Sequence, residues 1–179
     1  MKTVTKNLER DHEYILKLTD IMVRMTHTEK VEIDHLQTVV NLIRNFADGL
    51  HHAKEENLLF PKMTEKGFPK EGGPVGVMLM EHKLGRAYVK GMDENIELYR
   101  NGDKHALAQV FTNMLGYADL LKNHIYKENN ILFRMADGAF SEGEQKQMLD
   151  EFEDVESNYK NGRLSEFITA IADLNEKYS

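Results

Sequence analysis

The sequence contains no cysteine, and only three of its 179 residues are proline. Without cysteine the chain has no disulfide, no thiolate nucleophile, no iron–sulfur cluster, no cysteine-ligated zinc and no covalently attached c-type haem. Any metal must therefore be bound by imidazole and carboxylate groups. Those ligands suit iron, manganese, zinc or copper, so composition alone does not choose among them.

Long apolar runs and clusters of basic residues are also missing. The 23 Lys and Arg residues against 30 Asp and Glu residues give a formal net charge of −7. This balance disfavours nucleic acid and anionic membrane surfaces as partners. No apolar run is long enough to cross a membrane, and no signal-peptide pattern begins the chain. We therefore expect a soluble, cytoplasmic protein with one sizeable core.

Apolar residues recur every three or four positions in four long segments, which is the period of a helix face packed on a core. The segments cover residues 4–22, 33–58, 78–99 and 107–135, and the apolar stripe of the last includes Ile131 and Met135. No segment alternates with the period of two that is typical of a strand, so we expect no sheet. Four long helices joined by short loops predict an all-α, up-down-up-down four-helix bundle.

Residues 1–137 are predicted to form this bundle, and residues 138–179 a C-terminal helical extension packed on one side or end of it. Ser141 and Glu144 form a capping box at the start of one charged helix in the extension. Asn161-Gly162 separates that helix from a last amphipathic one. We expect the charged extension to form a solvated face, which leaves open a contact in a homodimer.

An internal repeat carries the most informative polar residues. The stretch H-H-A-K-E-E-N-L-L-F (51–60) matches H-I-Y-K-E-N-N-I-L-F (124–133) at six positions, which are His, Lys, Glu, Asn, Leu and Phe. The helix before each copy also contains an acid–His pair, Asp11-His12 or Glu81-His82. The chain is therefore predicted to contain a duplicated helix–helix unit.

In each unit a His-x-x-x-Glu pair lies on the apolar stripe, where a buried Glu is costly unless it is paired or bound to metal. The spacing of four places both side chains on one helix face. Six candidate ligands follow from the two units: His12, His51, Glu55, His82, His124 and Glu128. Six ligands would leave a single octahedral ion without an open position, whereas two carboxylates can each be shared by two ions. We therefore expect a paired-metal site in the middle of the bundle.

Three motifs resemble the hemerythrin superfamily, specifically the bacterial HHE cation-binding domains. They are H-H-A-K-E-E-N-L-L-F-P, E-G-G-P-V-G-V-M-L-M-E-H-K-L-G-R and L-L-K-N-H-I-Y-K-E-N-N-I-L-F, within residues 1–137. The resemblance implies a non-haem di-iron centre, with an oxo or hydroxo bridge, that binds O2 or related small oxidants. It implies the same six ligands, and it implies that Glu55 and Glu128 bridge the two iron ions.

One position departs from the family pattern. Oxygen-carrying hemerythrins have a further histidine one turn after the third-helix ligand, and this chain has Arg86 there. We therefore expect sensing, detoxification, iron handling or iron-centre repair in preference to reversible oxygen carriage. The expected ligand is O2, peroxide or nitric oxide. A di-iron oxidase, peroxidase or nitric-oxide reductase is the alternative, although no nucleophile motif or substrate pocket supports an enzyme.

Four residues close to the expected ligands have more than one interpretation. Tyr117 is either a core residue or a group that reaches the site. Arg86 either binds an anion at the site or pairs with a surface carboxylate. His52 and Glu56 lie about 100° round the helix from the ligand face, so we favour an outer or surface position for them over metal ligation.

The acids that precede two of the expected ligands also have two interpretations. Asp11 and Glu81 either accept a proton from a neighbouring ring nitrogen or are ordinary exposed acids. The remaining histidines are expected at the surface: His27, His35 and His105.

Overall fold

The computed structural model describes residues 3–160 and 162–179, so Asn161 of the predicted helix break lies outside the described residues. Every regular element in those ranges is helical. The first long helix is α1 (Val4–Thr26), and the third is α4 (Pro74–Arg100). The second comprises α2 (Ile33–Leu42), η1 (Ile43–His52), η2 (Glu55–Leu59) and α3 (Phe60–Glu65). The fourth comprises α5 (Ala106–Lys127), η3 (Glu128–Leu132) and α6 (Phe133–Ala139).

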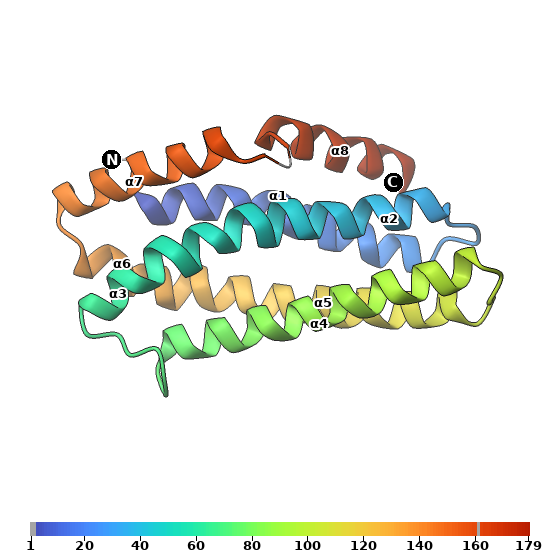
Figure 1. Ribbon diagram of the computed structural model, residues 1–179, viewed down its shortest axis with the longest axis horizontal. Coiled ribbons are helices and arrows are strands. Elements are labelled where there is room, and N and C mark those ends of the chain that lie inside the picture. Colours follow the sequence, from blue (N-terminus) through green and yellow to red (C-terminus); the bar gives the residue numbers. More distant parts are fainter. Residues whose placement is uncertain (1–2, 161) are drawn as a thin grey trace.

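These four rods lie side by side and are joined by loops at their ends (Figure 1). The predicted all-α four-helix bundle is confirmed. Local signals in the sequence explain where several rods begin: the Thr3 side chain caps α1 by accepting from the Lys6 amide, and Pro74 opens α4 at a position where its missing N–H costs nothing. None of the described helices combines the length and apolarity needed to cross a lipid bilayer.

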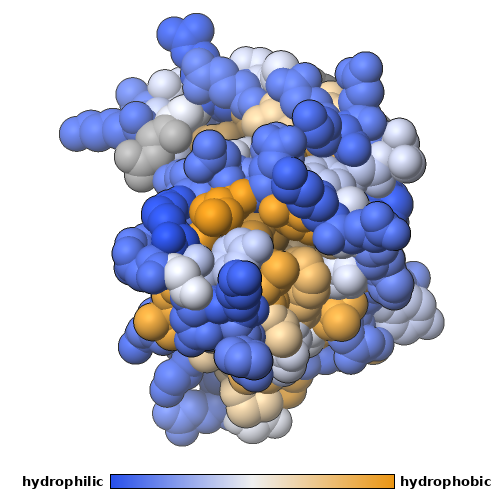
Figure 2. Space-filling view, turned by 90° about the vertical axis from the view of Figure 1, so that its right-hand side faces the viewer, coloured by the Kyte–Doolittle hydropathy of each residue, from blue (hydrophilic) through white to orange (hydrophobic). Residues whose placement is uncertain are grey.

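Two further helices, α7 (Glu142–Asn158) and α8 (Leu164–Lys177), run along the α1 side of the bundle (Figure 1). The predicted capping box of Ser141 and Glu144 is present at the start of α7. Phe152 of α7 and Ile171 of α8 are buried in the apolar clusters of the bundle. The extension therefore completes the core. In the view onto the end of the bundle, apolar side chains gather at the centre and hydrophilic ones surround them (Figure 2).

The core consists of two apolar clusters with a polar layer between them. Along α1, Leu8 belongs to one cluster and Ile15 to the other, and His12 lies between them. Along α4, Met78 and Val89 belong to the two clusters and flank the candidate ligand of that helix in the same way. The candidate ligands therefore lie in a middle layer that has an apolar cluster on each side along the bundle.

In the fourth rod, the buried residues that follow Glu128 differ from those predicted by the helical period. Ile131 and Met135 were expected in the core, yet they are 51% and 36% exposed, whereas Leu132 and Phe133 are buried. The reason is the π-helical segment η3, whose i→i+5 hydrogen bonds take more residues per turn and move the stripe along by one position. The second rod shows the same change after η2, where Leu59 and Phe60 are buried.

Candidate metal centre

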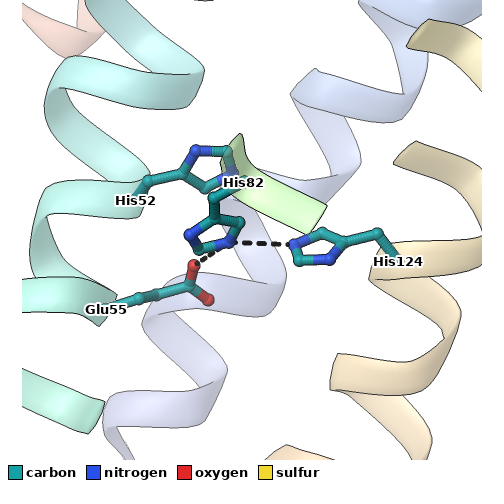
Figure 3. A group of neighbouring side chains, drawn as sticks. All are labelled: His52, Glu55, His82 and His124. Atoms are coloured by element: carbon teal, nitrogen blue, oxygen red, sulfur yellow. Dashed lines mark hydrogen bonds and ion pairs between the residues drawn. The ribbon is translucent and has the colours of Figure 1, made fainter. Parts of the chain in front are cut away.

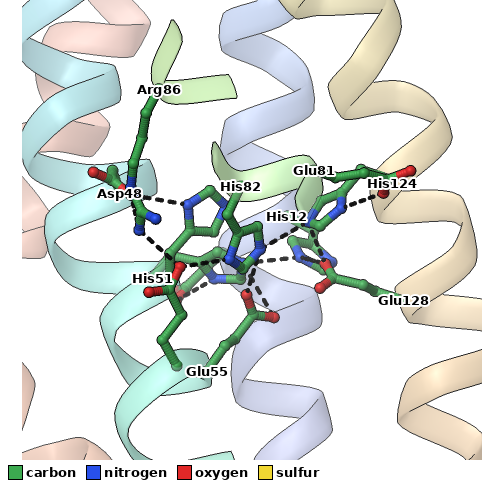
Figure 4. A network of polar contacts seen from close by, with 12 residues as sticks. His12, Asp48, His51, Glu55, Glu81, His82, Arg86, His124 and Glu128 are labelled. Atoms are coloured by element: carbon green, nitrogen blue, oxygen red, sulfur yellow. Dashed lines mark hydrogen bonds and ion pairs between the residues drawn. The ribbon is translucent and has the colours of Figure 1, made fainter. Parts of the chain in front are cut away.

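All six predicted ligands meet in the middle layer of the bundle (Figure 4). Each is at most 2% exposed. They come from α1, η1, η2, α4, α5 and η3: His12, His51, Glu55, His82, His124 and Glu128. Three of them lie in π-helical segments, which are rare and occur frequently at functional sites.

Hydrogen bonds at the outer ring nitrogens determine which way each imidazole presents its lone pair. In the first half of the site, His12 Nδ1 lies 2.7 Å from Asn129 Oδ1, and His51 Nδ1 lies 3.5 Å from Asp11 Oδ2. Both partners are oxygen acceptors, so both Nδ1 atoms carry the proton. In a neutral ring the Nε2 atom then presents a lone pair.

The second half repeats this arrangement. His82 Nδ1 donates to Glu56 Oε1 at 2.7 Å, and His124 Nδ1 donates to Glu81 Oε2 at 2.9 Å. Of the two interpretations given above for Asp11 and Glu81, the first holds: both accept a hydrogen bond from a ring nitrogen. Each acid faces a histidine of the next long helix and not the histidine beside it in the sequence: Asp11 faces His51, and Glu81 faces His124. Such acceptors fix the tautomer and raise the basicity of a metal-binding imidazole.

The four Nε2 atoms converge. His12 Nε2 lies 3.0 Å from His51 Nε2, and His82 Nε2 lies 3.1 Å from His124 Nε2. With every Nδ1 protonated and each ring neutral, two nitrogen lone pairs face each other in each of these pairs. A cation near each pair would remove that repulsion.

Both central carboxylates lack hydrogen bonds. None of the four oxygens of Glu55 and Glu128 has a hydrogen-bond partner. Glu128 Oε2 lies 3.2 Å from His12 Nε2, and Glu55 Oε2 lies 3.4 Å from His82 Nε2. Burial and the neighbouring charge of Glu128 raise the pKa of Glu55 well above its usual 4.5. Two buried acids in one layer are the donor set that divalent cations would neutralise.

The candidate ligand atoms form two groups. Within each group, every ligand atom lies within 4.8 Å of the others. One consists of His12, His51, Glu55 and Glu128; the other consists of His52, Glu55, His82 and His124 (Figure 3). Glu55 belongs to both groups, as expected of a carboxylate shared by two ions. The structure therefore supports a two-metal arrangement.

His52 is the residue that sequence reasoning underestimated. It is 5% exposed, so the predicted surface alternative is wrong for it. Its Nδ1 atom lies 3.2 Å from Asp48 Oδ1. His52 ends the π-helical segment η1, in which successive side chains fan out by less than the about 100° of an α-helix. The signal in the sequence that could have indicated this position is the pair of adjacent histidines, His51-His52, in the first copy of the repeat.

Arg86 pairs with two carboxylates beside the site. Its Nε donates to Asp48 Oδ1 at 2.8 Å (Figure 4). One of its terminal nitrogens donates to Glu56 Oε1 at 2.7 Å. Those two acids are the acceptors for His52 and His82. Of the two predicted roles, the structure shows carboxylate pairing, and this pairing holds the two acids that face His52 and His82.

A small cavity opens beside the second group. It has a volume of about 210 Å³, and its walls include His52, His82, Arg86 and Tyr117. Tyr117 is 2% exposed, and burial together with the charge of Asp48 raises the pKa of its hydroxyl, which therefore stays protonated. Pockets for drug-sized ligands usually measure about 300–1,000 Å³. This cavity suits a smaller molecule.

A buried lysine ties the site to the C-terminal extension. Lys54 is fully buried, and its Nζ donates to Asp11 at 2.6 Å, to Glu156 of α7 at 2.7 Å and to Asn7 at 2.8 Å. Its equivalent in the second copy, Lys127, pairs with Glu81. Each copy of the repeat therefore places a lysine on the acid that faces a ligand histidine.

The fold and this layer define a class of protein: a helical bundle whose buried imidazoles and carboxylates bind cations. Comparison with known families gives the same result, because residues 3–136 match the model described as the hemerythrin HHE cation binding domain. The chain belongs to this family, and the resemblance predicted from its motifs is confirmed. No curated protein and no solved structure matched it.

Proposed function

We propose that the middle layer binds two iron ions and that this centre binds or reacts with O2, peroxide or nitric oxide, in sensing, detoxification or iron handling. The observation that carries the proposal is the pair of buried carboxylates, Glu55 and Glu128, which have no hydrogen-bond partner and face four imidazole nitrogens. Two divalent cations would satisfy both acids in a setting where isolated charges are costly.

The residues divide naturally between two ions. His12 and His51 would hold one ion, His82 and His124 the other, and Glu55 with Glu128 would be shared. Bound iron would supply redox chemistry and open positions for a small ligand. The choice of iron follows from the family, because imidazole and carboxylate ligands also accept manganese or zinc.

The protein itself contributes orientation and exclusion of water. The acceptors at each Nδ1 hold the four imidazoles in the ligating tautomer. The apolar clusters on either side keep bulk water out of the layer. The cavity of about 210 Å³ beside His82 favours a diatomic or peroxide ligand over a large organic substrate. The homodimer expected from the sequence stays a prediction.

The test is a set of reactions of the anaerobically reduced, iron-loaded protein with O2, hydrogen peroxide and nitric oxide, followed by optical spectroscopy. We expect new absorption bands with at least one of the three. Glu128→Ala should lose metal and the bands while its helical circular dichroism stays, and His105→Ala should behave like the wild type. Absence of any spectral change with all three would refute the proposed ligand class.

The same samples separate the possible roles. Reversal of the bands on removal of the ligand would indicate binding or sensing. Catalytic consumption of the oxidant with a supplied reductant would assign a di-iron oxidoreductase. Rapid transfer of iron to a chelator from the wild type would assign iron handling or iron donation.

A further inference from the structure

His52 breaks the internal symmetry of the site. The second copy of the repeat has Ile125 at the equivalent position. His52 Nε2 is buried without a hydrogen-bond partner, and within residues 3–160 and 162–179 the other side-chain atoms in that condition are the oxygens of Glu55 and Glu128. The large majority of buried side-chain polar atoms are paired, so each exception needs an explanation. The two carboxylates face the proposed ions, and His52 shares their layer.

The tautomer of His52 is the one that a ligand requires. Its Nδ1 faces Asp48 Oδ1 at 3.2 Å, an acceptor, so Nε2 presents the lone pair. Arg86 holds Asp48 in place at 2.8 Å. The same chain of support, a ring nitrogen, an oxygen acceptor and a cation behind the acceptor, is present at His51, His82 and His124.

The position of His52 also fits one of the two ions. Its ligand atom lies within 4.8 Å of those of Glu55, His82 and His124. Its ring stacks on that of His82, with centroids 3.7 Å apart and planes 17° apart (Figure 3). Rings that bind one ion point their lone pairs at a common centre, so one of the two must tilt on metal binding. The cavity beside His52 provides the space for that rotation.

We infer that His52 is a metal ligand, so that the ion beside His82 and His124 is bound by three imidazoles and the ion beside His12 and His51 by two. This inference rests on the proposed two-metal function. The third helix has Arg86 where a further histidine would lie one turn after His82. His52 then supplies from the second helix the imidazole that the third helix lacks, and Arg86 orients it through Asp48.

The test is an anaerobic Fe2+ titration against a competing chelator, with 57Fe Mössbauer spectra of the loaded proteins. His52→Ile copies the residue of the second repeat, and His105→Ala is the surface control. We expect two ions in the wild type and in the control. In His52→Ile the affinity for one ion should fall at least about 10-fold, the affinity for the other should stay, and one of two Mössbauer doublets should change. The double variant His52→Ile with Arg86→His should recover the affinity for that ion. A purely structural role of His52 would not produce this recovery.

The outcomes are separable. Fewer than two ions in the wild type would refute the proposed function itself. Two ions bound with unchanged affinities and unchanged doublets in His52→Ile would overturn the role of His52 and leave the di-iron centre standing. If His52→Ile does not fold by circular dichroism, a crystal structure of the iron-loaded wild type decides. His52 Nε2 at about 2.1 Å from iron supports the inference, and a distance beyond roughly 3 Å overturns it.

Discussion

Lys54 and Glu156 form a partly buried ion pair, 2.7 Å long, between the second helix of the bundle and α7. The same ammonium group lies 2.6 Å from Asp11, which faces the ring of His51. The C-terminal extension is thereby connected to the candidate ligand His51 through three side chains. This gives α7 a structural role at the site, although it contributes no predicted ligand.

Replacement of Glu156 should weaken the docking of α7. Glu156→Ala leaves the fully buried Lys54 with Asp11 and Asn7 as its remaining partners, and we expect a loss of about 1–3 kcal/mol in the free energy of unfolding. Faster amide exchange in α7 should accompany it. Glu153→Ala, on the exposed face of the same helix, is the control. Equal stability of the two variants in urea denaturation would mean that the pair contributes nothing.

Loss of Glu81 should weaken metal binding without removing a ligand. Glu81 accepts from His124 Nδ1 at 2.9 Å, and this bond holds the ring in the ligating tautomer. Glu81→Ala should lower iron affinity by about 10- to 100-fold in a chelator competition. Glu97→Ala removes an exposed acid of the same helix and should leave the affinity unchanged. Wild-type affinity in Glu81→Ala would show that the hydrogen bond does not tune the ligand.

The shifted stripe of the fourth rod predicts opposite results for two neighbouring residues. Leu132 is 1% exposed and Ile131 is 51% exposed. Leu132→Ala should cost about 2–5 kcal/mol of unfolding free energy, because it leaves a cavity in the core. Ile131→Ala should change it by only about 0.5 kcal/mol. Denaturation of both variants after removal of metal checks this, and the reverse order would contradict the placement of η3.

Acid should remove the contribution of the α7 capping box. The ammonium of Lys66 and the bonds from Ser141 lower the pKa of Glu144 from 4.5 to about 2. A depressed pKa in the folded state means that stability is present above the unfolded value and is lost as the pH falls toward about 2. Metal-free Glu144→Gln should therefore be less stable than the metal-free wild type at pH values above 4.5. The difference should shrink below that pH, and a difference independent of pH would contradict this assignment.

The sequence predicted the layer of candidate ligands because the repeat and the helical period act together. A His-x-x-x-Glu pair is a weak signal alone, but its duplication at equivalent positions selects Glu55 and Glu128 from many acids. Both side chains are buried, as that reasoning predicts. The shifted stripe at Ile131 was not predictable by the same means, because a π-helical turn has no residue pattern that a 3.6-residue period would detect.

Long-range pairing was the other limit. Lys54 and Glu156 are separated by 102 positions in the chain, and nothing in either segment specifies the partner. A buried lysine next to a predicted ligand was itself the signal that an acid must lie nearby.

For His52, an assumed α-helical turn of about 100° placed the ring too far from the ligand face. The smaller rotation per residue in the π-helical segment η1 brings the ring into the buried layer instead.

The most direct test of the central claim is the metal content of the folded chain. Tag-free protein expressed with iron and desalted should contain about two iron ions per chain by elemental analysis, as expected for a carboxylate-bridged pair in a bundle core. A content of one or fewer, with no other transition metal making up the difference, would contradict the paired-iron account.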